Sequence, residues 1–467
     1  MTKIKWLLAL SLIILLMVVM VFSACSSPAP TTSQAPAPPP ATTAKPAPPP
    51  ATTAAPAPAP ASPVAQPSTT TAAPPAPPVK LYVGGTFALT GAYAEDCAAD
   101  LAGFQDYVKY VNDNKIIAPW HSDKKIPTNI TFELLWADDA LAADKTLTIY
   151  DDFKSKGMLV ERISGSPEGM ALKDKLIQDN IGATGQSASP AYLAPPGNIF
   201  TNAPIYTDQT AAIGEWFLKN WKDTSRKPRV AYITADSTLG RGMVIPEMQA
   251  YIEKIGFEFV GAQFVPMVPT SPPTTQLAWL KDNKVDLALG TMINPGSQPT
   301  IKEAVRLGMG TDLAYKITFG FAYPAHLQIF VPALGETGNG VVVAGDFCAM
   351  DAQVDGVKFM NDLQTKYRPD KKITHVMYLC GIIEAMTQVE ALRLAYLQVA
   401  PNKLTAKDVL EKGFRQIKNF STGGITITPL TYGPGDVEGV DQVRLQQVQA
   451  GKIVEIGAYP LRGIYTK

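Results

Sequence analysis

The chain has 467 residues, and its 41 basic and 41 acidic side chains leave no net charge. Because there is no basic block, nucleic acid is not the expected partner. Four cysteines are too few for a disulfide scaffold, no CxxC pair suggests zinc, and no two of the three histidines are within helical reach, so we expect no metal and no cofactor.

Residues 1–24 have the features of a secretory signal. Lys3 and Lys5 precede an apolar run over residues 6–22. A retained transmembrane helix is the alternative, but the run is shorter than the roughly 20 residues of a bilayer span and no charged stop-transfer segment follows it. The segment Phe22-Ser23-Ala24-Cys25 resembles the processing box of bacterial lipoproteins, with phenylalanine in place of the usual leucine. The resemblance implies that Cys25 is lipidated and anchors the protein to a membrane.

Residues 26–78 form a linker of low complexity. Of these 53 residues, 49 are proline, alanine, threonine or serine, and none is aromatic. Such a segment cannot offset the entropy of ordering, and its prolines favour extended polyproline II. We interpret residues 25–78 as a tether between the lipid and the folded residues, although low-complexity filler would behave in the same way.

From residue 79 onward, strands and helices alternate. In the expected first helix, Cys97, Leu101, Phe104, Val108 and Val111 lie on one face. Short turns between alternating strands and helices predict βαβ units and a parallel sheet covered on both faces. The strands are expected over 79–89, 131–136, 158–163 and 181–184, an extended piece over 198–202, and two further helices over 140–153 and 169–178.

The pattern starts again near residue 207, with no linker-like stretch before it. We therefore expect two α/β lobes joined by ordered crossings. In the last third, residues 374–399 form one long apolar helix that should be buried against a sheet, and residues 440–457 form a hairpin. In the second half, helices are expected over 207–221, 240–255, 274–282 and 298–307, and strands over 229–234, 257–264, 285–289 and 315–319.

The sequence contains no common enzyme motif. GxGxxG after a strand, GxxxxGK[ST], HExxH and GxSxG are absent, and residues 185–189 come nearest to the last but lack its second glycine. Asp138 and Asp139 are adjacent, so their side chains point apart, and we expect them to cap the next helix. Because no nucleophile, base and orienting residue can be combined, we predict that the protein is not an enzyme.

Several short segments between residues 79 and 467 occur in a characteristic order. They are Gly84-Gly85-Thr86-Phe87-Ala88-Leu89-Thr90-Gly91-Ala92-Tyr93-Ala94, Trp136-Ala137-Asp138-Asp139, Ile163-Ser164-Gly165-Ser166, Ser187-Ala188-Ser189-Pro190, Ala235-Asp236-Ser237-Thr238-Leu239-Gly240-Arg241-Gly242, Phe420-Ser421-Thr422-Gly423-Gly424-Ile425-Thr426-Ile427 and Gln449-Ala450-Gly451-Lys452. Together they resemble the type 1 periplasmic binding proteins, and in particular the leucine/isoleucine/valine-binding proteins of ABC transporters.

The resemblance implies an α/β fold of two Rossmann-like lobes with parallel sheets, joined by three crossovers and closing like a Venus flytrap on a small molecule. Residues 79–205 and about 347–430 would form lobe 1, and residues 206–346 and about 431–467 would form lobe 2. The implied function is an extracytoplasmic, lipid-anchored solute-binding protein that works with the permease of an ABC importer, and we expect a monomer. A ligand-sensing receptor of the same fold is the alternative, and a secreted hydrolase is a remote one.

The expected ligand contacts in lobe 1 follow its strands. Ser164, Gly165 and Ser166 end a strand and start a helix, where hydroxyl and free N–H groups suit a carboxylate, although Ser166 could simply cap the helix. The family implies further contacts by a backbone carbonyl and a hydroxyl at Gln186, Ser187 and Ala188, where alanine replaces the common threonine. Tyr93, in the first strand–helix turn, either lines the pocket or is a half-buried loop residue.

Lobe 2 departs from the family pattern. Leu239 stands where the family commonly has an aromatic residue, and no acid follows the strand that ends near residue 290. A buried ammonium needs a partner, so the ligand is expected to be an aromatic or aliphatic carboxylate or an amide. A branched-chain amino acid-like solute stays possible if Asp236 or Asp346 supplies the charge. Asn294 and Phe321 are further candidate contacts; Phe321 could equally belong to the core.

The cysteines other than Cys25 have structural interpretations. Cys97 lies on the apolar face of its helix as a small core residue. Cys348 and Cys380 are expected in or near one lobe, where they could pair in an oxidising compartment, but the sequence does not decide this.

Overall fold

The computed structural model of the protein describes residues 77–185 and 188–465. The signal, Cys25, nearly all of the linker, and the two candidate contacts Gln186 and Ser187 lie outside the described residues. The described residues belong to one compact unit, which runs from Ala73 to Lys467.

The first sheet has five parallel strands in the order β2-β1-β3-β4-β5. Apolar side chains fill most positions of β1 and β3, as expected for strands that are covered on both faces. The strands are β1 (Val79–Phe87), β2 (Ile130–Asp138), β3 (Met158–Ile163), β4 (Gly182–Gly185) and β5 (Ile199–Thr201), and the helices between them are α2 (Ala94–Asn114), η1 (Pro119–His121), α3 (Ala143–Ser155), α4 (Ser166–Asp179) and α5 (Pro190–Leu193).

The second sheet has seven strands in the order β14-β13-β12-β11-β8-β6-β7, of which β13 and β14 are antiparallel to their neighbours. Its strands are β6 (Arg229–Ala235), β7 (Glu258–Val265), β8 (Leu287–Thr291), β11 (Thr318–Ala322), β12 (Val342–Gly345), β13 (Gln442–Gln449) and β14 (Lys452–Pro460), and β9 (Met309–Gly310) pairs with β10 (Tyr315–Lys316). Its helices are α6 (Tyr206–Asn220), α7 (Thr238–Arg241), α8 (Pro246–Ile255), α9 (Thr274–Asp282), α10 (Asn294–Arg306), α11 (Leu327–Leu334) and η2 (Gly335–Gly338).

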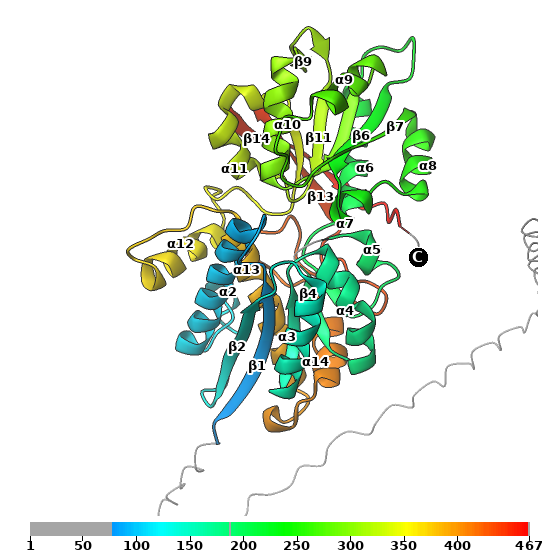
Figure 1. The fold of residues 1–467 in the computed structure, drawn as a ribbon. Helices are drawn as coiled ribbons and strands as arrows, with labels where there is room; N and C mark the ends of the chain where they lie inside the picture. The colour runs from blue at the N-terminus through cyan, green and yellow to red at the C-terminus, as the bar shows by residue number, and fades with distance from the viewer. Residues whose placement is uncertain (1–76, 186–187, 466–467) are drawn as a thin grey trace, which may run out of the picture. The chain divides into compact units, whose positions relative to one another are not determined.

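The remaining helices return to the first sheet: α12 (Asp355–Tyr367), α13 (Met377–Tyr396), η3 (Pro401–Lys403), α14 (Ala406–Lys412) and η4 (Phe414–Gln416). The long apolar helix is confirmed as α13, which is buried on almost every side because it packs between α2 and the strands β3 and β4. We call the first sheet with its helices lobe 1 and the second lobe 2 (Figure 1). The chain passes between them three times, after β5, after β12 and before β13.

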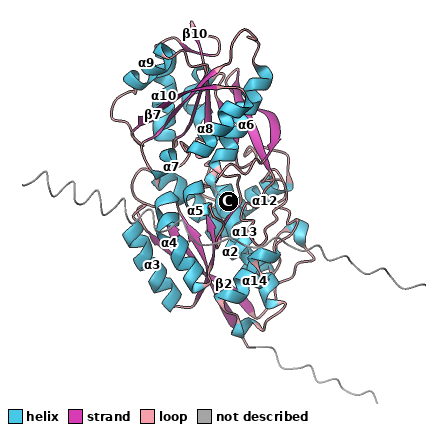
Figure 2. Cartoon of the chain, turned by 90° about the vertical axis from the view of Figure 1, so that its right-hand side faces the viewer, coloured by secondary structure: helices cyan, strands magenta, loops and turns pink. Residues whose placement is uncertain are grey.

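Side-chain alternation along the strands separates the two faces of each sheet. In lobe 2, Val230 and Tyr232 of β6 share a core with α6 and α8, whereas Ala231 and Ile233 share one with α9, α10 and α11. Figure 2 shows helices on both sides of the strands. Among the described helices, none combines the length and the apolar character that a membrane crossing requires.

Some elements differ from the sequence-based expectation. The single helix expected over 240–255 is two helices, because Pro246 begins α8 and separates it from the short α7. Helix α10 begins at Asn294, four residues earlier than expected, with Pro295 in its first turn. Helices α11, α12 and α14 and strand β12 were not predicted.

A close crossing of α2 and α13 depends on glycine. A Cβ atom on Gly381 would lie 2.0 Å from the Asp100 carbonyl oxygen, and one on Gly103 would lie 2.1 Å from that of Tyr378. We expect Gly381→Ala to destabilise the protein by about 1–3 kcal/mol, because two helix backbones would have to separate. Urea unfolding measures this.

Gly214→Ala is the matched control, since its Cβ would meet ordinary contacts at 3.5 Å and 3.7 Å within α6. There the better helix propensity of alanine should raise stability by about 0.5–1 kcal/mol. Equal stability of Gly381→Ala and the unaltered protein would contradict the close crossing.

Candidate functional site

A cavity of about 70 Å³ lies where loops at the carboxyl ends of strands in both lobes meet. This exceeds the roughly 10–15 Å³ that a single water molecule requires. In parallel α/β sheets ligands bind at this edge of the strands. The residues that line it are Ala92, Tyr93, Leu141, Ser164, Gly165, Ser166, Pro167 and Tyr206 from lobe 1 and the first crossing, and Ser237, Thr238, Leu239, Met267, Ile293 and Pro324 from lobe 2.

The structure brings five of the ten residues proposed from the sequence to this cavity: Tyr93, Ser164, Gly165, Ser166 and Leu239. Each follows a strand of a parallel sheet, which is the reason that the sequence pattern could locate them. Gln186 and Ser187 lie outside the described residues. Contact between any of these residues and a ligand stays a prediction.

Three proposed residues do not belong to the lining. Phe321 has no exposed surface, because alternation along β11 turns its ring into the core shared with α10 and α11. Asn294 accepts a hydrogen bond from the backbone N–H of His326 at 3.2 Å, and its neighbour Ile293 lines the cavity instead. Ala188 is buried away from the lining, in the core of lobe 1.

The hydroxyl group of Ser164 is turned into the protein. It donates to the carbonyl oxygen of Thr86 at 2.8 Å and accepts from Arg162 Nη1 at 3.1 Å. It therefore has no proton left for an anionic ligand, which corrects the expected role of this hydroxyl. The backbone around Gly165 and Ser166, at the start of α4, still faces the cavity.

An acid lies behind this helix start. Glu168, in the first turn of α4, is fully buried, and neither of its carboxyl oxygens has a hydrogen-bond partner among the described residues. A Cβ atom on Gly165 would come within 3.0 Å of Glu168 Oε2. Burial raises the pKa of Glu168 to about 7. Because residue 165 is glycine, the carboxyl group of Glu168 can pack directly behind the cavity wall.

The paired acids after β2 hold a loop of the site. Asp138 accepts hydrogen bonds from the backbone N–H groups of Leu89 and Ala140, and Asp139 accepts one from that of Leu141. Ala140 and Leu141 both have positive φ angles, which these bonds stabilise. The acids therefore shape the loop that brings Leu141 to the cavity, and the expectation that they cap the next helix is wrong, since the residue before α3 is Ala142 without a side-chain cap.

The wall from lobe 2 carries a polar group that the sequence did not identify. The Oγ atom of Ser237 is buried and has no hydrogen-bond partner among the described residues. Ser237 lies just after β6, in the same segment as Leu239. Its position at the end of a parallel strand could therefore have identified it as a candidate contact. Thr238 beside it is exposed, and Met267 and Ile293 complete an apolar surface.

None of the lining residues carries a charged side chain. Asp236 pairs with Arg241 Nη2 at 2.6 Å on the surface, and Asp346 accepts a hydrogen bond from Gln209. Burial raises the pKa of Asp346 well above its usual range, which favours its neutral form. The two acids named from the sequence as substitute partners for an ammonium therefore do not line the cavity.

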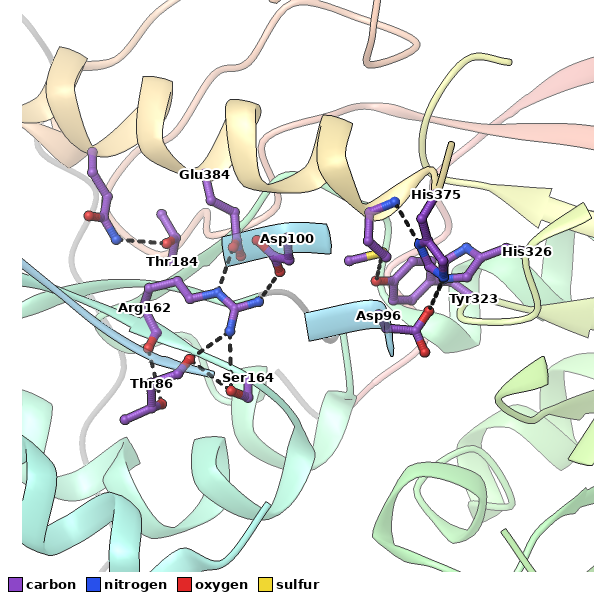
Figure 3. A network of polar contacts seen from close by, with 12 residues as sticks. Thr86, Asp96, Asp100, Arg162, Ser164, Thr184, Tyr323, His326, His375 and Glu384 are labelled. Carbon is purple, nitrogen blue, oxygen red and sulfur yellow. Dashed lines mark hydrogen bonds and ion pairs between the residues drawn. The ribbon is translucent and has the colours of Figure 1, made fainter. Parts of the chain in front are cut away.

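A buried ion network lies beneath the lobe 1 wall (Figure 3). Arg162 binds Asp100 through Nη2 and Glu384 through Nε at 2.7 Å, and all three are buried. Asp100, Cys380 and Glu384 place potential metal ligands within 4.8 Å of one another. Because the guanidinium of Arg162 already binds both carboxyl groups, we interpret the cluster as structural. Cys348 and Cys380 are free and buried, so they do not form a disulfide.

Two α/β lobes with a largely apolar, partly open cavity at their strand ends define a solute-binding protein of the two-lobed type. The family model for periplasmic binding proteins matches residues 80–452, and the chain belongs to this family. No curated protein matches the sequence.

Solved structures share the fold. A branched chain amino acid ABC transporter structure from Thermus thermophilus with bound valine has a TM-score of 0.72 at 19% identity, covering 83% of this chain and 98% of that one. A fatty acid ABC transporter substrate-binding protein from Thermomonospora curvata has a TM-score of 0.67 at 18% identity, covering 83% of this chain and 95% of that one. A solute binding protein from Rhodopseudomonas palustris BisB5 in complex with 3,4-dihydroxy benzoic acid has a TM-score of 0.65 at 16% identity. The match covers 82% of this chain and 98% of that one.

Proposed function

We propose that this protein is an extracytoplasmic, lipid-anchored receptor that binds a small carboxylate or amide and delivers it to an ABC importer. The observation that carries the proposal is the cavity between the lobes, which has apolar walls, a helix start and a buried hydroxyl without a hydrogen-bond partner in the described part of the chain. Membership of a family of binding proteins supports the prediction that it is not an enzyme. The signal-like segment and Cys25 support the anchor.

The cavity favours a ligand without an ammonium group. None of the described residues that line this partly open cavity carries a carboxylate, so an ammonium buried there would lack a partner, which costs several kcal/mol. A carboxylate or amide can instead use Ser237 Oγ and the backbone at the start of α4. The structures with bound valine and with bound 3,4-dihydroxy benzoic acid show that this fold accommodates both kinds of ligand.

Calorimetry with matched solutes tests this proposal. We expect 3-methylbutanoate or its amide to bind at least as tightly as valine, which has the same branched chain and an added ammonium. The panel should also contain aromatic acids and short aliphatic acids. Binding of valine alone would contradict the proposed ligand class, and no binding by any member would contradict the receptor function.

Filling the cavity should abolish binding. Leu239→Trp places an indole ring in a space of about 70 Å³, and we expect affinity for whichever panel member binds to fall by about 100-fold or more. Leu397→Trp is the matched control, since Leu397 is exposed and lies at the end of α13, outside the lining. Equal affinities of the two variants would show that the solute binds elsewhere.

A further inference from the structure

Two of the three histidines meet at one carboxylate where the lobes touch (Figure 3). Asp96, in the first turn of α2, and His375, just before α13, belong to lobe 1, whereas His326 precedes α11 in lobe 2. His375 Nε2 lies 3.1 Å and His326 Nε2 3.5 Å from Asp96 Oδ1. We call these three residues the interlobe cluster.

The cluster is buried and its hydrogen bonding is incomplete. His326 is 6% and Asp96 is 5% exposed, and neither His326 Nε2 nor Asp96 Oδ1 has a hydrogen-bond partner of good geometry among the described residues. The Nδ1 atom of His375 accepts from the backbone N–H of Met377 at 3.2 Å, so in the neutral ring the proton is on Nε2, facing Asp96. His375 is therefore held within lobe 1, and His326 is the part of the cluster that lobe 2 contributes.

The interlobe cluster adjoins the ligand cavity on both sides. Tyr93, in the cavity wall, directly precedes α2, whose first turn carries Asp96. Pro324, in the opposite wall, lies two residues before His326. The ring of Tyr323 packs against both sides, with its centroid 5.0 Å from that of His326 and 6.3 Å from that of the cavity residue Tyr206. A change in how the lobes meet at the cluster would therefore reach the cavity.

The other titratable groups around His326 do not supply a second negative charge. Tyr93 and Tyr323 are buried, which raises their pKa values and keeps them neutral. Asp346 shares a small cavity with His326, but burial raises its pKa as well. Asp100, the next acid on α2, is bound by Arg162. One carboxylate, that of Asp96, thus faces two imidazole rings.

We propose that the interlobe cluster is a pH-dependent contact that holds the lobes together while His326 is neutral and loosens when His326 takes up a proton. When the lobes separate, Asp96 and His375 stay together in lobe 1, and His326 becomes exposed to water. An imidazolium is well solvated there, whereas in the closed protein it would be buried beside a carboxylate that His375 already shares.

The direction of the effect follows from linkage. Burial lowers the pKa of His326 below its ordinary value, and Asp96 offsets this only in part. His326 therefore binds protons more weakly in the closed form than in water, so acidification favours the open form. If the cavity holds a solute as proposed above, acid would also weaken solute binding; this consequence rests on the proposed function, while the contact itself does not.

Lobe separation can be measured without any solute. Fluorescent labels on Lys145→Cys in α3 and Lys254→Cys in α8 report the distance between the lobes, in the full-length chain with Cys25→Ser to prevent labelling there. Energy transfer is compared at about pH 5 and about pH 8, which bracket the usual titration of histidine. We expect the ratio of closed to open molecules to fall at the lower pH by roughly fivefold or more, as is typical of coupled sites.

His326→Gln should remove this response, because glutamine keeps an N–H group near Asp96 and does not titrate. His121→Gln is the matched control, since His121 is buried within lobe 1, where its Nε2 lies 2.8 Å from the Ser421 carbonyl oxygen. The same pH response in both variants, or closure at the lower pH in the unaltered chain, would overturn the proposal.

A second measurement follows His326 directly in the unaltered chain, and variants serve only to assign the signals. With only three histidines, each imidazole gives a separate NMR signal, and the His121→Gln and His375→Gln spectra leave that of His326 identified. We expect His326 to titrate below the ordinary histidine pKa of about 6.5. A higher value would overturn the proposal. Absence of solute binding at about pH 8 would instead count only against the proposed function.

Discussion

Replacing Arg162 with methionine should destabilise the folded protein by about 3–5 kcal/mol. Arg162 is fully buried in β3, and its guanidinium binds Asp100 of α2 and Glu384 of α13 as well as the carbonyl oxygen of Thr86 at 2.7 Å. Methionine fills a similar volume but leaves two carboxyl groups buried without a cation. Burial then favours their neutral forms, and the hydrogen bonds that join the two helices to β3 are lost.

Urea unfolding of Arg162→Met measures this loss, with Arg226→Met as the control. Arg226 binds Asp286 with two hydrogen bonds, but it is 45% exposed, so solvent screening should limit its effect to about 1 kcal/mol or less. Replacing Asp100 and Glu384 by leucine together with Arg162→Met should recover much of the stability, since an apolar cluster leaves no buried charge. Equal losses for the two single variants would contradict a structural role of the network.

The folded protein should lose stability as pH rises, because Glu161 must then lose its proton in a buried position. Glu161→Gln should remove this loss. Glu161 is fully buried in β3 on the face opposite Arg162, and neither of its carboxyl oxygens has a hydrogen-bond partner among the described residues. Burial raises its pKa to about 8. Between the ordinary value near 4.5 and about 8, the folded protein keeps a proton that the unfolded chain releases.

The contribution of Glu161 to the free energy of unfolding should therefore be greatest below about pH 5. It should fall by on the order of 3 kcal/mol by about pH 8. Glutamine has the same shape and no charge, so Glu161→Gln should match the unaltered protein near pH 5 and exceed it near pH 8. Unfolding midpoints in urea at the two pH values measure the difference. If both proteins lose stability equally over this range, Glu161 is not the group responsible, and Glu168 and Glu438, with pKa values raised to about 7, become the candidates.

The role of the serines in lobe 1 shows the limit of motif reasoning. The sequence predicted that Ser164 and Ser166 lie after a strand at the ligand edge, and both line the cavity. The direction of one hydroxyl could not be predicted, because Ser164 Oγ is bound by Arg162 and Thr86, whose positions depend on how β1 and β3 pair. The buried acid Glu168 behind Gly165 was likewise visible only in three dimensions.

The fold class could be predicted from the sequence, because hydrophobic periodicity and strand–helix alternation are local properties. The edge that carries the cavity could also be predicted, because parallel strands bring their carboxyl ends together. Which side chains reach that edge could not be predicted, because it depends on contacts between distant parts of the chain. Phe321 faces the core rather than the cavity through the pleat of its strand, and His326 and His375, distant in sequence, meet at Asp96. Such contacts depend on the packing of separate elements, and no local pattern encodes that packing.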